Sequence, residues 1–441
     1  MAFLDSGNVG DVGGNVMGKA SSSFFESLLK ERCCLCVGAG ATTTYVGSWK
    51  TLLGKLLGRR FVSAWLSEGQ SFDHISRYIN EDCFSGFFTE EGFLEIGEFL
   101  LADDSVPKPE GFTQSIAVWQ ELLFSEQVSD IIQRGISDAL KKECLNAVCS
   151  RYGKCLMGHN TTHSYVDIYN VYKDGKEPCG FINKNFGTAM SLVEICLKSQ
   201  TRHVITYNFD TVIEETLYEV IDAGSDDASG IRQIHIWTFG SKKSTLEVLH
   251  SDRCSVFLHQ GTWDDGSKSL TDSGAIHFYH VHGVASGNRI AGESGQLVFS
   301  QHSYEVYQDT PLNWSNQVLQ YLFSQYRVLA VGFSGTDTNF RYFASHHIKS
   351  EVNDFLFGKE RNENRIVFLK AKQPYRDAIR AALDKCEPKR IGNIQDRMEE
   401  RFLSYCTSMV ENYYRNYYDI SIKWVETYTD IARVLHKALS K

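Results

Sequence analysis

The stretch Arg32–Thr42, RCCLCVGAGAT, decides the expected fold. After Arg32, the five residues CCLCV form a short apolar run, and this run is ended by Gly38, Ala39 and Gly40. In GSWKTLLGKLL, at residues 47–57, apolar residues then recur at helical spacing. The pattern predicts a buried strand, a glycine turn and a helix, which is a typical opening of an α/β domain.

Strand-like runs return after residue 200, and most of them are followed by turn residues or by a helical stretch. The runs are HVITYNF, IRQIHIWTF, IHFYHVHG, GQLVFSQ, RVLAVGF and RIVFLKA. Strands that alternate with helices favour a parallel sheet, because each crossover needs a helix-length connection. We therefore expect an α/β fold with a Rossmann-like, mainly parallel sheet, flanking helices and a large helical insertion.

Composition and periodicity divide the chain into four parts. Residues 1–23 are rich in Gly, Ser and Asn and are predicted to be a flexible segment. Residues 24–60 and 200–390 are predicted to form the α/β domain, and residues 61–199 a mostly helical insertion. Residues 391–441 are predicted to be a helical extension with a final strand and helix. Its aromatic run ENYYRNYYDI is interpreted as a helix face that packs on the core, with an interaction surface as the alternative.

Charge and hydropathy narrow the range of partners. The formal net charge of -9 argues against a broad nucleic-acid footprint, which needs clustered Lys and Arg. The start of the chain lacks a basic segment followed by an apolar one, and no run approaches a membrane span. We expect a cytoplasmic protein with no direct nucleic-acid or membrane partner. Its twelve cysteines are expected to be reduced thiols, with Cys33, Cys34 and Cys36 as core residues.

The glycine turn is the first of four motifs that could carry chemistry. Glycines between a strand and a helix let backbone N–H groups approach a pyrophosphate, so Gly38, Ala39, Gly40 and Thr42 are candidate ligands. A tight turn can also need glycine for steric reasons alone. The third glycine and the acidic residue of the usual dinucleotide fingerprint are not clear in this sequence.

The second motif is TYNFD, residues 206–210, at the carboxyl end of the strand HVITYNF. Ligands of open α/β sheets bind at such strand ends, which makes Thr206, Asn208 and Asp210 candidate site residues. Asp210 is also a plausible N-cap for the helix that follows.

The third motif is YHVHG, residues 279–283, which closes another strand. Histidine is the side chain best suited to proton transfer near neutral pH. We favour a functional role for His282, because Gly283 after it lets a ligand approach, and a structural role for His280. No further metal ligands are apparent, so no metal is assigned.

The fourth motif is VGFSGTD, residues 331–337, where a strand again runs into a glycine-bearing turn. Gly332 and Ser334 are candidate phosphate ligands. Asp337 could hold a ribose hydroxyl or cap the next helix, and the sequence leaves both readings open.

The ordered set GAGAT, TYNFD, HVHG and GFSGTD resembles the sirtuin-like NAD-consuming domains, especially those of bacterial antiphage defence. The resemblance covers about residues 30–345, apart from the insertion. It implies that the glycine turn holds the NAD phosphates, and that Asn208 orders the nicotinamide ribose or an attacking water with Asp210 beside it. It further implies that His282 acts as general base on ribose hydroxyls and that Ser334 meets a phosphate or ribose.

One departure from the family pattern bears on the reaction. Deacylases of this family carry a zinc ribbon of two C-x-x-C pairs between the His-Gly and Gly-Ser motifs, whereas residues 283–334 contain no cysteine. The resemblance therefore implies a metal-free NAD glycohydrolase that releases nicotinamide and ADP-ribose and takes NAD as its substrate. The alternatives are a non-catalytic oligomeric module that senses NAD or ADP-ribose and, less favoured, an NAD-dependent protein deacylase. The family also leads us to expect a homo-oligomer, and gating by the insertion, the extension or a partner protein encoded nearby.

Overall fold

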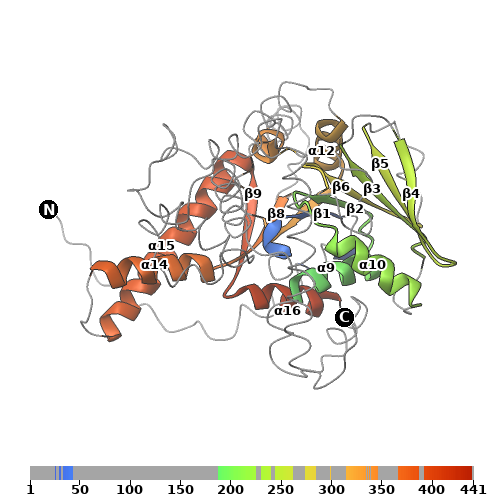
Figure 1. Cartoon of the computed structure of the whole chain (residues 1–441). Coiled ribbons are helices and arrows are strands. Elements are labelled where there is room, and N and C mark those ends of the chain that lie inside the picture. Colours follow the sequence, from blue (N-terminus) through green and yellow to red (C-terminus); the bar gives the residue numbers. More distant parts are fainter. Residues whose placement is uncertain are drawn as a thin grey trace, which may run out of the picture.

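The computed structural model shows a nine-stranded sheet with helices on both faces (Figure 1), so the predicted α/β class is confirmed. The structure describes residues 25, 29–30, 33–42, 187–224, 230–239, 244–261, 274–284, 298, 314–333, 335, 337, 339–345, 366–386 and 392–439. The predicted flexible segment 1–23, most of the predicted insertion, the helix at 47–57, nearly all of the GQLVFSQ strand and Ser334 lie outside these residues.

The described elements follow one another along the chain in an alternating pattern. They are β1 (Cys33–Val37), η1 (Ala39–Ala41), α9 (Gly187–Lys198), β2 (His203–Thr206), α10 (Val212–Asp222), β3 (Gln233–Thr238), β4 (Ser244–His250), β5 (Ser255–Gln260), β6 (Ala275–His280), α12 (Trp314–Gln325), β7 (Arg327–Val331), β8 (Ile366–Ala371), α14 (Gln373–Cys386), α15 (Gly392–Tyr418), β9 (Ile420–Val425) and α16 (Tyr428–Leu439). Residues 339–345 are also helical.

The strand order creates a point at which the direction of winding reverses. The order is β4-β5-β3-β6-β2-β1-β7-β8-β9, and every pair except β4–β5 is parallel. The chain steps from β1 to β2 on one side and places β7 on the other. The six neighbouring strands β6-β2-β1-β7-β8-β9 thus repeat the 3-2-1-4-5-6 order of dinucleotide-binding folds. In these folds, ligands bind where the order reverses. That point lies between the carboxyl ends of β1 and β7.

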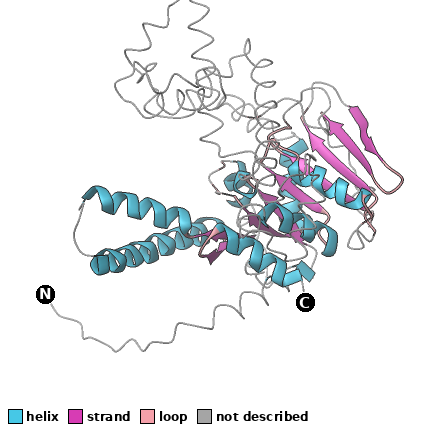
Figure 2. Ribbon diagram, turned by 60° about the horizontal axis from the view of Figure 1, so that its bottom comes forward, coloured by secondary structure: helices cyan, strands magenta, loops and turns pink. Residues whose placement is uncertain are grey.

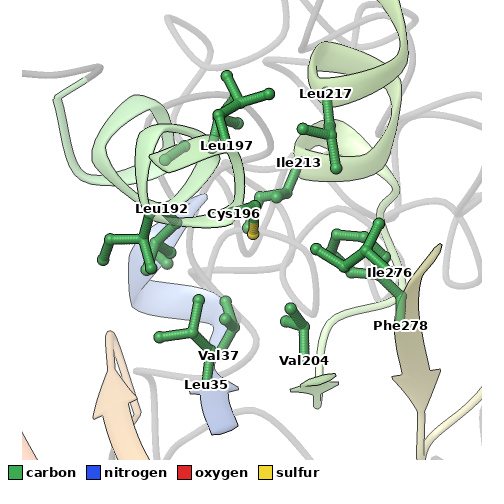
Figure 3. Packing of buried hydrophobic residues seen from close by; sticks show 14 of the residues in the cluster. Leu35, Val37, Leu192, Cys196, Leu197, Val204, Ile213, Leu217, Ile276 and Phe278 are labelled. Carbon is green, nitrogen blue, oxygen red and sulfur yellow. The ribbon is translucent and has the colours of Figure 1, made fainter. Parts of the chain in front are cut away.

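Two apolar cores fill the two faces of the sheet, as expected for a parallel sheet covered on both sides. Along β1, Leu35 and Val37 contribute to the core beneath α9, α10 and α16, and Cys34 and Cys36 to the core beneath α12. Figure 3 shows the first core, where side chains of α9 and α10 meet those of β1, β2 and β6. Fully buried β1 is therefore fixed from both faces, and this fixes the turn that follows it.

The cysteines of β1 behave as core side chains. Cys33 and Cys36 have C-x-x-C spacing, but alternation along the strand assigns them to different cores. Burial raises the pKa of the Cys34 and Cys36 thiols well above their usual value, because a thiolate would lose its hydration. Both thiols are therefore unreactive in the folded protein.

The sequence patterns missed one pair of strands. β4 and β5 form an antiparallel hairpin on the edge of the sheet beyond β3. The side chains of β4 are intermediate or exposed, so this strand lacks the continuous apolar run that marked the central strands.

The C-terminal elements are integrated with the sheet. β9 pairs in parallel with β8, and α16 lies against α9, where His436 Nδ1 is 2.8 Å from Glu194 Oε2. α14 and α15 lie beside each other and extend away from the sheet in both views (Figures 1 and 2). Within the part of the chain that the structure describes, no helix is long and apolar enough to cross a membrane.

Candidate functional site

The four motifs meet at one edge of the sheet. β1, β2, β6 and β7 run parallel, so the residues that follow each strand emerge on the same side. Backbone hydrogen bonds tie these ends together: Gly38 N–H donates to Val331 O, Tyr207 N–H to Val37 O, and Val281 N–H to Thr206 O. Residues that are far apart in the sequence are thereby placed side by side at the reversal point.

The glycine turns after β1 and β7 pack backbone against backbone. A side chain on Gly38 would place its Cβ 2.6 Å from Gly332 O, and Gly332 itself has a φ of +64°. The N–H groups of Gly38 and Gly40 donate to the carbonyls of Val331 and Gly332. Gly38 and Gly332 are thus required sterically. Because the N–H groups of Gly38 and Gly40 are already bonded within the fold, a phosphate at this turn would have to be bound by other donors.

Asn208 is held at three points. Its backbone N–H donates to Thr206 Oγ1 at 3.1 Å, its carbonyl lies 3.0 Å from His280 Nδ1, and its side-chain Nδ2 donates to Thr42 Oγ1 at 3.0 Å. The remaining polar atom, Oδ1, is buried and has no hydrogen-bond partner among the residues that the structure describes. An unsatisfied buried acceptor costs about 1–3 kcal/mol, so it calls for an explanation, and a ligand that completes the site is one.

A directed relay fixes which way the Asn208 amide points. Thr42 Oγ1 donates to Asp210 Oδ2 at 2.9 Å, because an ionised carboxylate can only accept. The Thr42 oxygen is then available as an acceptor, and it receives the N–H of Asn208. The amide oxygen must therefore turn away from Thr42. The orientation of Asn208 depends on the charge of Asp210, although the two side chains are joined only through a hydroxyl.

Asp210 titrates unusually high for an aspartate. Burial, and then the nearby charge of Glu214, raise its pKa to about 6, while the Thr42 hydroxyl and the Val212 N–H act in the opposite direction. Its Oδ1 accepts from Val212 N–H at 3.3 Å, but the N-cap position of α10 is occupied by Thr211. The simple N-cap assignment for Asp210 was thus wrong by one residue, and the carboxylate serves both the helix end and the relay.

His280 supports Asn208 from behind. The ring is fully buried, with Nδ1 facing the Asn208 carbonyl and Nε2 lying 2.8 Å from Glu214 Oε1. A carbonyl can only accept, so Nδ1 carries a hydrogen and the Nε2 contact shares a proton with the carboxylate. This geometry agrees with a structural role for His280, because both ring nitrogens are engaged within the fold.

His282, which follows β6, lies close to Asp337, which follows β7. Nε2 of His282 lies 3.2 Å from Asp337 Oδ2, and the second carboxylate oxygen accepts from Phe340 N–H at 2.8 Å. Asp337 thus caps the helix at 339–345 and also orients the imidazole. The Tyr207 ring packs edge-on against His282 at 4.9 Å.

The structure therefore brings most of the expected site residues into two linked clusters. One joins Thr42, Thr206, Asn208 and Asp210, and the other joins His282 to Asp337; Tyr207 lies between them. Gly283 adopts a φ of +92°, a sufficient steric reason for glycine at that position. The Glu214–His280 pair was missed, because Glu214 could be recognised from the sequence only as an acid in the first turn of a helix.

Among the described residues, no group of three or more His, Cys, Asp and Glu side chains is arranged to hold a metal ion. The strand order, together with polar side chains gathered at its reversal, is typical of Rossmann-like nucleotide-binding domains. Residues 202–382 match the family model of the SIR2-like domain. The chain thus contains a SIR2-like domain, which implies NAD-related activity of the sirtuin kind. No curated protein matches the chain.

Proposed function

We propose that this chain is an NAD glycohydrolase that cleaves the nicotinamide–ribose bond and transfers the ADP-ribosyl group to water. The observation that carries the proposal is Asn208 Oδ1, which is buried and has no hydrogen-bond partner among the described residues. It lies at the reversal point of the sheet, and most strands of that sheet belong to the SIR2-like domain. Every other polar atom of Asn208 is engaged, so the acceptor is preorganised at a cost in stability. A ribose hydroxyl or the attacking water is a donor of the kind that it lacks.

The chemistry asks mainly for positioning and charge stabilisation. Nicotinamide leaves from a cationic ring as a neutral molecule, and the ribose carbon passes through an oxocarbenium-like state. Asn208 Oδ1 would accept a hydrogen from the water or the ribose, and the relay through Thr42 would keep the amide in that orientation. His282 would take a proton at Nδ1, and Asp337 would stabilise the imidazolium that results.

Water is proposed as the acceptor because of the cysteine-free stretch at residues 283–334. A zinc ribbon in that interval would support a protein substrate, and its four thiolate ligands cannot be supplied there. Residues 38, 39, 40, 42, 206, 283, 332, 334 and 337 remain our proposed NAD contacts. Donors other than the Gly38 and Gly40 N–H groups would serve the phosphates.

The biological setting that we propose is NAD depletion in antiphage defence, on the strength of the motif resemblance. An unregulated enzyme of this kind would kill its host, so activity would be gated. The insertion, the C-terminal extension or a protein encoded nearby could supply the gate, and a homo-oligomer is part of the same proposal.

Ionisation of Asp210 should set the acid limb of the pH profile. Below about pH 6 the protonated carboxyl can donate to Thr42, the relay reverses, and the Asn208 amide loses its fixed orientation. We expect kcat/KM to fall as the pH is lowered through about 6. The matched variant Asp210→Asn should be slower but should lack that limb. An acid limb that stays unchanged in Asp210→Asn would belong to another group and would contradict the relay.

The proposed activity is tested by incubating the full chain with NAD and quantifying nicotinamide and ADP-ribose. The chain is assayed alone and after co-expression with the proteins that are encoded nearby. Equimolar release of both products supports hydrolysis. Turnover that requires an acylated peptide would indicate a deacylase, and binding without turnover in every combination would indicate a sensing module.

A further inference from the structure

The apolar face of helix α15 is only partly covered by the rest of the fold. One side of the helix is buried, with Leu403 and Tyr414 only 3% and 5% exposed. Tyr414 packs against Phe368 of β8 at a ring distance of 5.3 Å, and Trp424 of β9 donates to Glu411 at 2.7 Å. These contacts anchor α15 to the sheet and leave the adjoining side of the helix to solvent.

A row of large apolar side chains follows that adjoining side, and we call it the α15 stripe. Its members recur every three or four residues, and are therefore on one helix face. They are Met398, Phe402, Tyr405, Met409, Tyr413 and Tyr417, which are 39–66% exposed. Six of the nine exposed large hydrophobic residues recorded for the described chain thus lie on one helix, and such concentration marks an interaction surface.

The charges beside the α15 stripe restrict what can bind there. Glu399 and Glu400 are paired with Arg376, and Glu411 accepts from Trp424. The stripe itself contains no Lys, Arg, Asp or Glu. Arg397, Arg401 and Arg415 are exposed elsewhere on α15, and Arg341 lies 5.9 Å over the Tyr413 ring. The stripe itself is uncharged, so it suits another aromatic and methionine-rich surface.

A second copy of the stripe has that chemistry and the matching spacing. The midpoint between Met398 and Tyr413 lies next to Tyr405. An antiparallel two-fold arrangement about this midpoint places Phe402 level with Met409 of the partner subunit, and Met398 level with the partner's Tyr413. Methionine sulfur and aromatic rings attract each other, and a two-fold contact makes each pair twice.

We propose that the α15 stripe is the contact through which two copies of this chain associate. Each aromatic side chain can bury about 150–250 Å². Six side chains that are about half exposed therefore offer on the order of 600 Å² per chain, and pairing would bury about 1,200 Å². This lies at the lower bound for specific interfaces, so the dimer is reversible and its population depends on concentration.

The test is sedimentation velocity of the full chain over a wide concentration range. Wild type should shift from monomer to dimer, and Phe402→Glu and Met409→Lys should each raise the dissociation constant about 100-fold or more. Ser408→Glu adds a charge on an exposed position outside the stripe and should leave the constant within a few-fold of wild type. Circular dichroism confirms that each variant is folded.

Mixing the variants Phe402→Glu and Met409→Lys tests the antiparallel alignment. In the mixed dimer, one of the two contacts joins the new glutamate of one chain to the new lysine of the other, and the second contact keeps the native Phe402 and Met409. The mixture should recover dimer that neither variant forms alone. A wild-type chain that stays monomeric, or a dimer that both stripe variants leave intact, overturns the proposal. Failure of NAD turnover has no bearing on this result.

Discussion

Asn208→Ala is expected to lower NAD turnover by about 100-fold or more while leaving the free energy of unfolding within about 1 kcal/mol of wild type. The substitution removes the proposed contact to water or ribose, and it also removes a buried acceptor that has no partner among the described residues. The lost hydrogen bond to Thr42 and the relieved desolvation act in opposite directions on stability. Thermal unfolding and a nicotinamide-release assay on the same preparation would measure both effects.

The Thr42 variants control for the relay. Thr42→Ser keeps the hydroxyl that links Asn208 to Asp210 and should retain most activity, whereas the nearly isosteric Thr42→Val removes it and should reduce kcat about 10-fold or more. Equal activities for Ser and Val at position 42 would contradict an oriented amide. If Asn208→Ala lost activity only in proportion to its folded fraction, Asn208 would be a structural residue.

Asp337→Asn should have the second large effect, through the tautomer of His282. Asparagine can still cap the helix at Phe340 N–H, but its amide N–H would donate to His282 Nε2 and force the ring hydrogen onto Nδ1. The proposed proton acceptor would then be blocked. A change of this kind in other His–Asp pairs costs about 10⁴-fold in kcat, and we expect a loss of at least about 100-fold here, with little change in stability.

The losses of activity caused by substituting His282 and Asp337 should not add up. His282→Ala is expected to lose about as much activity as Asp337→Asn, and the double variant should lose no more than either single variant. Asp337→Ala provides the stability control, because loss of the cap should cost about 1 kcal/mol. Losses that multiply in the double variant would show that His282 and Asp337 act independently.

The sequence was sufficient to place most of the polar motifs at strand ends, because short apolar runs that stop at TYNFD, YHVHG and VGFSGTD are visible locally. It could not pair their side chains. Thr42 and Asn208 are 166 residues apart, and Glu214 and His280 are 66 apart, so their contacts depend on strand order and register. Of the two readings left open for Asp337, the helix cap has support, since Oδ1 accepts from Phe340 N–H, whereas the ribose contact stays a prediction.

Other elements escaped the sequence for identifiable reasons. β4 is an edge strand with no buried side chain, so it lacks the apolar run that marks a central strand. The aromatic run at residues 411–420 was interpreted as a face packed on the core, and this is correct for Tyr414 but not for Tyr417, which is 66% exposed. Helical periodicity shows that side chains share a face, but it cannot tell how much of that face the fold covers.

The central claim is that water receives the ADP-ribosyl group at the site built around Asn208. Its most direct test is incubation of the full chain, with co-expressed neighbouring proteins, in ¹⁸O-labelled water containing NAD, followed by mass spectrometry of the products. We predict nicotinamide and singly labelled ADP-ribose in equal amounts from wild type, and neither above background from Asn208→Ala. Labelled ADP-ribose formed equally by wild type and Asn208→Ala, or NAD left intact by the wild type in every combination, would contradict the account.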